Sequence, residues 1–219
     1  MLITPWFSFL HVPKTGGSFV RRVLSDHLGD AVEATYHHEP WEQLPDRQLP
    51  VLCFVRNPWD WYVSWYHYLH QYHYGPGDHA ELVKDPLYRS AFGAGKNDFR
   101  TTVRRACLGM IDVRQPEVER LMGELDADFY TARFRFIVGA GLDDERLTVG
   151  RYEYLLEDLT AFLARTQTPG QDALFAAVEH SPRERTSEHR HYRDYYDDEL
   201  RDLVRTRSRW VIERFGYEF

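Results

Sequence analysis

The chain has 219 residues, a formal net charge of -7, 43% hydrophobic residues and 28% charged residues. This composition is typical of a folded soluble protein, and the length fits a single domain. The negative charge argues against broad nucleic-acid binding, and no apolar window is long enough to span a membrane. Cys53 and Cys107 lack the spacing of a disulfide framework, so we expect core thiols and a cytoplasmic protein.

The first predicted element is a buried strand over residues 3–12, which are rich in β-branched and aromatic side chains and stop at Pro13. The segment PKTGGS follows, and apolar residues then recur at helical intervals from Val20 to Leu28. The order strand, glycine-rich loop, helix is the first half of a βαβ unit.

A second predicted strand, PVLCFVRNP, begins at Pro50 and has the length and β-branching of a central strand. Asn57 is a good N-cap, Pro58 suits the first helical position, and Asp60 places negative charge in the first turn. The pattern therefore predicts a helix that begins here and continues through WDWYVSWYHYL.

The remaining chain alternates further helices and strands. Residues 80–127 predict helices, part of a helical insertion over about 75–130 in a single domain of residues 1–219. FRFIVG (134–139) and LTVGRY (147–152) are predicted short strands, and residues 153–166 and 197–215 are predicted amphipathic helices. This order predicts an α/β, three-layer fold with a central, mainly parallel sheet flanked by helices.

The glycine-rich loop contains the parts of an anion site. Gly16 and Gly17 allow close backbone approach, the following helix offers free N–H groups, and Lys14 supplies a compact positive charge. Thr15 and Ser18 can donate hydroxyl hydrogen bonds. The lysine precedes the glycines, unlike the Walker A order GxxxxGK[ST], so the loop departs from that of a nucleoside triphosphatase.

A second anion site is predicted at the next strand end. Arg56 offers a planar charged fork suited to phosphate, and Ser64 lies two helical turns into the helix that follows. Anion sites on neighbouring strands predict a ligand with two separated anionic groups.

These segments resemble the PAPS-dependent sulfotransferases, especially the carbohydrate-type branch with short bacterial members. HVPKTGGS is similar to the family's 5′-phosphosulfate loop, and FVRNPWDWYVSWY to its 3′-phosphate element with the same Arg-to-Ser spacing. VGRYEYLLED, YRDYYDDEL and ERFGYEF resemble later family segments. The resemblance covers most of the chain, with residues 75–130 least matched, and implies the P-loop-like fold of that family.

The resemblance implies transfer of a sulfuryl group from 3′-phosphoadenosine 5′-phosphosulfate (PAPS) to an acceptor hydroxyl, with adenosine 3′,5′-bisphosphate (PAP) as product and no metal. Lys14 would contact the leaving phosphate and the sulfuryl group, Arg56 and Ser64 the 3′-phosphate, and Tyr152 the adenine. The implied donor-binding residues are Pro13, Lys14, Thr15, Gly16, Gly17, Ser18, Phe19, Arg56, Ser64 and Tyr152, with Ser187 and Arg190 as added 3′-phosphate contacts.

The acceptor hydroxyl needs a base, and TYHHEP offers His37, His38 and Glu39 between the two phosphate elements. Histidine titrates near neutral pH and is the usual general base. The resemblance implies a catalytic histidine or glutamate here, but the histidine doublet leaves its alignment ambiguous. We favour His38, then His37, with Glu39 third.

Other interpretations stay open at this point. A magnesium-dependent nucleotide or small-molecule kinase could use PKTGGS as a variant phosphate loop, and a binding module could hold an adenine nucleotide without chemistry. His67, His70 and His73 recur every third residue, but that spacing drifts around a helix and does not favour a metal site. The acceptor, predicted as a carbohydrate or glycolipid, and the oligomeric state are not determined by the sequence.

Overall fold

The computed structural model describes residues 1–35, 38–45, 48–74, 84–182 and 189–219. Contacts divide the chain into two units. We call residues 1–56 with 137–186 the sheet unit, and residues 57–136 with 187–219 the helical unit. The single-domain organisation of residues 1–219 stays a prediction.

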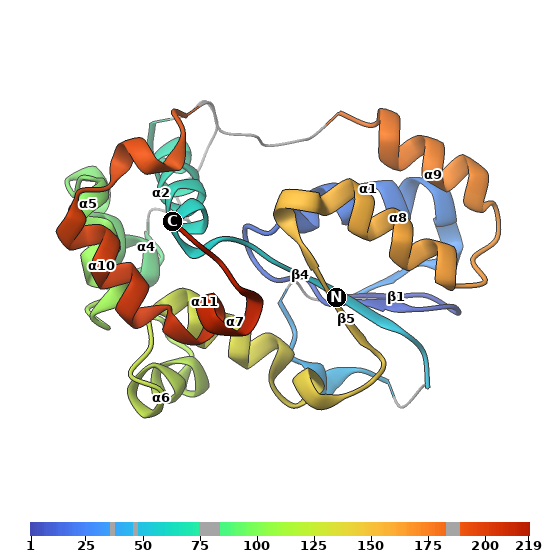
Figure 1. The fold of residues 1–219 in the computed structure, drawn as a ribbon, viewed down its shortest axis with the longest axis horizontal. Helices are drawn as coiled ribbons and strands as arrows, with labels where there is room; N and C mark the ends of the chain where they lie inside the picture. Colours follow the sequence, from blue (N-terminus) through green and yellow to red (C-terminus); the bar gives the residue numbers. More distant parts are fainter. Residues whose placement is uncertain (36–37, 46–47, 75–83, 183–188) are drawn as a thin grey trace. The chain divides into compact units, whose positions relative to one another are not determined.

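The sheet unit is built on a mixed sheet whose described strands are β1 (Leu2–Ile3), β2 (Ser8–Phe9), β3 (Glu33–Ala34), β4 (Val51–Val55) and β5 (Leu147–Arg151). Their order across the sheet is β3-β1-β2-β4-β5. β4 pairs in parallel with β2 and β5, whereas β1 pairs antiparallel with β2 and β3. β1 therefore runs opposite to the other described strands, and the prediction of a mainly parallel α/β sheet is confirmed (Figure 1).

β4 is the central strand that the second apolar run predicted. All five of its residues are buried, so both of its faces are covered by other parts of the chain. A run of β-branched and aromatic residues is what a parallel strand buried on both faces requires. The strand predicted at residues 147–152 is likewise confirmed over Leu147–Arg151, as β5.

The first apolar run was predicted to be one strand. In the structure it is a hairpin. β1 and β2 pair through Leu2 with Phe9 and Ile3 with Ser8. Between them the Thr4 N–H donates to the Phe7 carbonyl at 3.0 Å, and the Thr4 hydroxyl donates to the same oxygen at 2.7 Å. Pro5 has no N–H for a strand ladder, and this turn satisfies the neighbouring polar groups instead.

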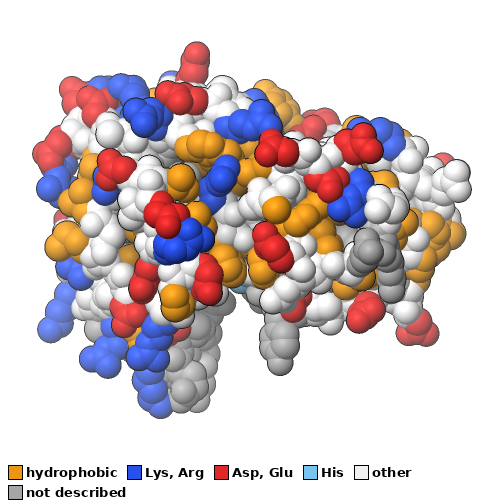
Figure 2. All heavy atoms as spheres, turned by 90° about the horizontal axis from the view of Figure 1, so that it is seen from below, with side chains coloured by type: hydrophobic (Ala, Val, Ile, Leu, Met, Phe, Trp, Pro, Cys, Tyr) orange, Lys and Arg blue, Asp and Glu red, His pale blue; other side chains and the backbone are white. Residues whose placement is uncertain are grey.

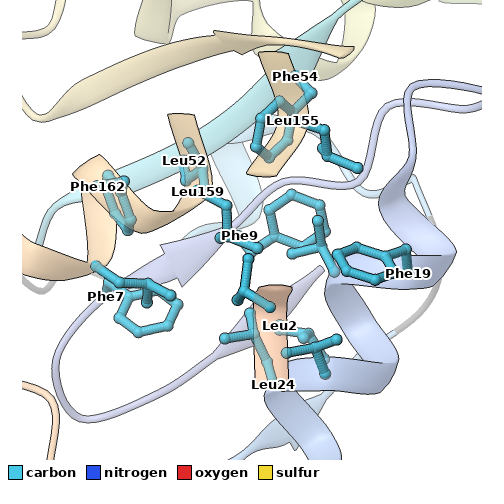
Figure 3. Close-up of a cluster of buried hydrophobic side chains, with 14 of the residues drawn as sticks. Leu2, Phe7, Phe9, Phe19, Leu24, Leu52, Phe54, Leu155, Leu159 and Phe162 are labelled. Carbon is cyan, nitrogen blue, oxygen red and sulfur yellow. The ribbon is translucent and has the colours of Figure 1, made fainter. Parts of the chain in front are cut away.

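Three α-helices of the sheet unit are α1 (Gly17–Leu28), α8 (Leu155–Arg165) and α9 (Gln171–His180). They share one apolar core with the strands, to which α1 contributes Val20 and Leu24 and α8 contributes Leu159. Figure 3 shows Phe9 of β2 in the middle of this cluster, between side chains of the neighbouring strands and helices. Full burial of each such side chain contributes about 1.5–3 kcal/mol, which holds the helices on the sheet.

Short 3-10 helices complete the described sheet unit: η1 (Gly29–Ala31), η2 (Trp41–Gln43), η4 (Gly139–Asp143) and η5 (Tyr152–Tyr154).

The helical unit contains α2 (Pro58–Tyr74), α4 (Pro86–Phe92), α5 (Phe99–Cys107), α6 (Pro116–Glu124), α7 (Phe129–Val138, whose last two residues belong to the sheet unit), α10 (Asp198–Arg207) and α11 (Arg209–Phe215), with η3 (Gly93–Gly95) and η6 (Tyr192–Tyr195). The prediction of helices between residues 80 and 127 is confirmed from residue 84 onward, where the description resumes. The start of α2 also follows the prediction, because the Trp59 N–H donates to the Asn57 side chain at 3.0 Å.

The predicted strand at residues 134–139 is wrong, because most of this segment is the end of α7. Phe134 and Phe136 alternate as in a strand, but Tyr130, Phe134 and Ile137 are buried at helical spacing. The Thr131 N–H donates to the Asp128 side chain at 2.8 Å and caps the helix. A buried N-cap thus overrides a short apolar alternation.

Candidate functional site

The candidate site lies in the sheet unit, where β2, β4 and β5 end. Carboxyl ends of parallel neighbouring strands lie at one edge of a sheet, which is where ligands bind in such folds. The loop of residues 12–16 follows β2, Arg56 follows β4, and Tyr152 follows β5. These are three of the positions that the sequence predicts for the donor site.

The loop after β2 is a tight turn with two left-handed residues. Lys14 has φ 62° and Gly16 has φ 83°. The buried Thr15 hydroxyl donates to the Val12 carbonyl at 2.8 Å, which ties the loop back to the strand. Thr15 therefore fixes the turn in this conformation, and its predicted hydrogen bond to a bound phosphate stays a prediction.

Helix α1 begins directly after the turn. The Val20 N–H donates to the Gly16 carbonyl at 3.2 Å, so the N–H groups of Gly17, Ser18 and Phe19 precede the first bond of the helix. Such groups, with the positive end of the helix dipole, favour an anion. The Phe19 side chain is buried in the core, so only its backbone is suited to a ligand.

Arg56 connects the three strand ends. Its side chain is buried, and Nη1 donates to the Lys14 carbonyl at 3.0 Å. Its Cζ lies 3.9 Å from the centre of the Tyr152 ring, which is close enough for a cation–π contact. Arg56 thus braces the loop that carries Lys14 as well as lying where the sequence predicts a phosphate ligand.

Gly16 lies against the segment that follows β5, at η5 and the start of α8. A Cβ added there would lie 2.9 Å from Cδ2 of Leu155 and 3.2 Å from Cδ2 of Tyr152. With its positive φ, this close approach requires glycine. Pro13, Lys14, Thr15, Gly16, Arg56 and Tyr152 therefore belong to one arrangement of loop and strand ends, although their contact with a nucleotide stays a prediction.

The base candidates differ in what they contact. The Glu39 carboxylate accepts a hydrogen bond from the Thr35 hydroxyl and lies 3.7 Å from the amine of Met1, so it already has partners. Nδ1 of His38 lies 2.8 Å from the carbonyl oxygen of His11, the residue just before the loop. His37 lies outside the described residues.

His11 is a residue that sequence reasoning missed. Its side chain is buried, and its ring centre lies 4.8 Å from that of His38. A Cβ added at Gly17 would lie 1.9 Å from Cδ2 of His11, so the imidazole covers the first residue of α1. The only signal in the sequence was a histidine directly before the loop.

The remaining predicted ligands belong to the helical unit or to undescribed residues. Ser64 lies on α2 and is buried. Arg190 is exposed, and its Cζ lies 5.3 Å from the centre of the Tyr195 ring. Ser187 lies outside the described residues. It stays a prediction that the nucleotide is bound by Ser64, Ser187 and Arg190.

His67 of α2 has other contacts in the helical unit. Nε2 of His67 lies 2.9 Å from the Tyr195 hydroxyl, and the His67 ring stacks on that of His189 with centres 5.1 Å apart. Burial, together with His189 and His70, lowers the pKa of His67 to about 4. Within the part of the chain that the structure describes, no group of three or more His, Cys, Asp or Glu residues is placed to hold a metal ion.

Three expectations from the composition of the chain can be compared with the structure. In the described residues no helix is both long and apolar enough to pass through a membrane. On the face drawn in Figure 2, Lys and Arg side chains lie among Asp and Glu side chains rather than forming one broad basic surface. Cys53 and Cys107 are unpaired and buried, and burial raises the pKa of both thiols.

Comparison with known proteins adds a likeness of fold. No model of a protein family matches the sequence, and no curated protein matches it. The crystal structure of the mouse sulfotransferase SULT7A1 complexed with PAP is similar over 93% of this chain and 84% of its own, with a TM-score of 0.53 and 13% sequence identity. The two chains share a fold. This likeness confirms the predicted α/β, P-loop-like architecture with its mainly parallel sheet.

Proposed function

We propose that the protein is a sulfotransferase that takes PAPS as donor and transfers its sulfuryl group to a hydroxyl of an acceptor. The observation that carries the proposal is the cluster of Lys14, Arg56 and Tyr152 at three neighbouring strand ends, tied together by the Arg56 side chain. The shared fold with a sulfotransferase that binds PAP supports it.

The loop and the start of α1 suit the 5′-phosphosulfate. The N–H groups of Gly17, Ser18 and Phe19 and the Ser18 hydroxyl can bind its oxygens, and Lys14 can neutralise charge on the leaving phosphate. Arg56 is the proposed ligand of the 3′-phosphate, joined by Ser64 and, from the last part of the chain, by Ser187 and Arg190. Tyr152 is the proposed adenine contact.

In the proposed reaction the acceptor oxygen forms a bond to sulfur while the bond from sulfur to the 5′-phosphate oxygen breaks. PAP leaves as an anion that Lys14 stabilises, and His38 takes the hydroxyl proton. Glu39 is the weaker candidate because its carboxylate already binds the Thr35 hydroxyl, and His37 remains the alternative histidine. Nucleotide phosphate is a stable leaving group, so we propose transfer without a metal.

The acceptor class is the broadest part of the proposal. We propose a carbohydrate or glycolipid hydroxyl, by resemblance of HVPKTGGS and FVRNPWDWYVSWY to the carbohydrate-type branch of the family. We also propose a cytoplasmic location, which the two buried, unpaired thiols support.

Calorimetric titration without magnesium tests the donor site first. PAP should bind about 10- to 100-fold more tightly than AMP, since a charged hydrogen bond to the 3′-phosphate contributes about 1.5–3 kcal/mol. A preference for ATP that appears only with magnesium would overturn the proposal in favour of a kinase. Tight PAP binding without sulfuryl transfer to any hydroxyl in an acceptor screen would favour a binding module.

A further inference from the structure

His11 occupies a rigid position between the sheet and the loop. The Leu10 N–H donates to the Leu52 carbonyl at 2.8 Å, which keeps the chain in the sheet up to the residue before His11. The His11 ring lies nearly parallel to that of Phe9, with centres 6.1 Å apart, and the residue is 6% exposed. His11 therefore has little freedom to move.

The His11 imidazole packs on the start of α1. A Cβ added at Gly17 would lie 1.9 Å from Cδ2 and 2.2 Å from Nε2 of His11. The space that a side chain at position 17 would need is thus filled by the imidazole. His11 forms part of the wall beside the N–H groups that the proposed function assigns to the phosphosulfate.

His11 also meets His38 through both its backbone and its ring. The His11 carbonyl oxygen, which can only accept, lies 2.8 Å from Nδ1 of His38. Nδ1 of His38 must therefore carry the hydrogen, and in the neutral ring Nε2 is the basic nitrogen. The two ring centres lie 4.8 Å apart at 56°, so the His11 ring also limits the orientation of the His38 ring.

The backbone of His38 fits a constrained role. Its φ of 68° lies in the left-handed region, which is uncommon for a residue with a side chain and costs of the order of 1 kcal/mol or more. Such conformations persist where the surroundings hold them in place. The hydrogen bond to the His11 carbonyl is one contact that does so.

We propose that His11 is a positioning residue for the base: its carbonyl fixes the tautomer of His38, and its ring limits the orientation of the His38 imidazole. This inference rests on the proposed function. His11 itself exchanges no proton in the reaction. The acceptor proton passes to Nε2 of His38 while the new oxygen–sulfur bond forms and the bond to the leaving phosphate breaks.

Nitrogen NMR of the imidazoles tests the tautomer without requiring activity. His27 and His180 provide internal references, because Nδ1 of each lies 2.9 and 2.7 Å, respectively, from a carbonyl oxygen one turn earlier. Neutral His38 should show the same Nδ1–H form in the full-length protein. An Nε2–H form of His38 would overturn the inference.

Kinetics of His11→Ala and His11→Phe separate positioning from folding. His11→Ala should lower kcat about 10- to 100-fold, with the KM for PAPS changed much less, because a misplaced base slows the chemical step. His11→Phe keeps a planar ring and the carbonyl, so most of the rate should return. His27→Ala, an exposed histidine on α1, is the control and should keep wild-type rates.

The outcomes distinguish the two proposals. A wild type that binds no PAP overturns the proposed function, and the base role of His38 with it. A wild type that transfers the sulfuryl group, together with a folded His11→Ala variant of unchanged kcat, overturns the inference about the His11 ring alone. If His11→Ala does not fold, a His11→Phe variant with less than about a tenth of the wild-type kcat overturns the inference.

Discussion

The guanidinium of Arg56, at the end of β4, donates a hydrogen bond to the backbone carbonyl of Lys14 at 3.0 Å. Lys14 is in a left-handed conformation, with φ 62°. The bond therefore stabilises the backbone that aims the Lys14 side chain. Arg56, which the sequence predicts as a ligand of the 3′-phosphate, thus also braces the loop that is predicted to bind the 5′-phosphosulfate.

Arg56→Ala should therefore weaken the binding of PAP and of AMP to different extents. PAP should lose about 10- to 100-fold in affinity, because the proposed charged contact with the 3′-phosphate is removed, and AMP should lose less, through the loosened loop. Calorimetry of both nucleotides measures the difference. Arg56→Lys keeps the charge without the planar fork and should fall between the wild type and the alanine variant. Equal losses for PAP and AMP would contradict the assignment of Arg56 to the 3′-phosphate.

Lys14→Ala should abolish transfer while leaving much of the nucleotide binding. In the proposed reaction the lysine charge matters most as the bond to the leaving phosphate breaks, and the loss of one such contact costs about 100- to 1000-fold in kcat. Single-turnover rates with bound PAPS, beside calorimetry of PAP, separate the two effects. Lys96→Ala, at an exposed lysine of the helical unit, is the matched control. If PAP affinity and the single-turnover rate fell by the same factor, Lys14 would be a binding residue only.

Gly17→Ala should damage the donor site although alanine is the better helix former. The new Cβ would meet the His11 imidazole at 1.9 Å and push the ring or the start of α1 away. We expect PAP affinity to fall by at least about tenfold. Gly123→Ala on α6 has no neighbour within 4 Å of its Cβ and should be neutral or stabilise the fold by up to about 1 kcal/mol. If Gly17→Ala bound PAP as tightly as the wild type, the His11 ring would be able to move without any effect on the donor site.

Asp128 should give the helical unit a pH dependence of unusual sign. Burial raises its pKa, although the Ser208 hydroxyl and the Thr131 N–H donate to its carboxylate. The folded state then holds the proton more tightly than the unfolded state. Its contribution to stability should fall as pH rises from about 4, the ordinary value for aspartate, to the raised pKa, and should stay constant above it.

Denaturant unfolding at several pH values tests this expectation with Asp128→Asn. Relative to the wild type, the variant should become more stable as pH rises through that window, because asparagine does not titrate. Asp98→Asn is the control: Asp98 also caps a helix, but its hydrogen bonds to Thr101 lower its pKa, so that contribution is lost as pH falls. If the free energy of unfolding changed with pH in the same way for the wild type and Asp128→Asn, the raised pKa of Asp128 would not explain the pH dependence.

Local sequence signals predicted much of the fold. Asn57 followed by Pro58 marked the start of α2, and the all-apolar run at residues 51–55 marked the buried central strand. In both places the local preference agrees with the burial that the fold imposes. The predicted helix over residues 197–215 is interrupted at Ser208, between α10 and α11. There the Ser208 hydroxyl donates to Asp128, far away in sequence, which no helical pattern can encode.

The sequence by itself determined the two strand-end segments and the kind of chemistry that they suit. Glycines after a strand, a lysine in the turn and an arginine at the next strand end express local backbone and charge requirements, which a short segment can satisfy alone. Tertiary structure alone decided that Arg56 braces Lys14 and stacks on Tyr152, and that His11 contacts His38 through its carbonyl and its ring. These relationships join residues from 27 to 96 positions apart, as His11 from His38 and Arg56 from Tyr152, so they arise only when the sheet brings the strand ends together.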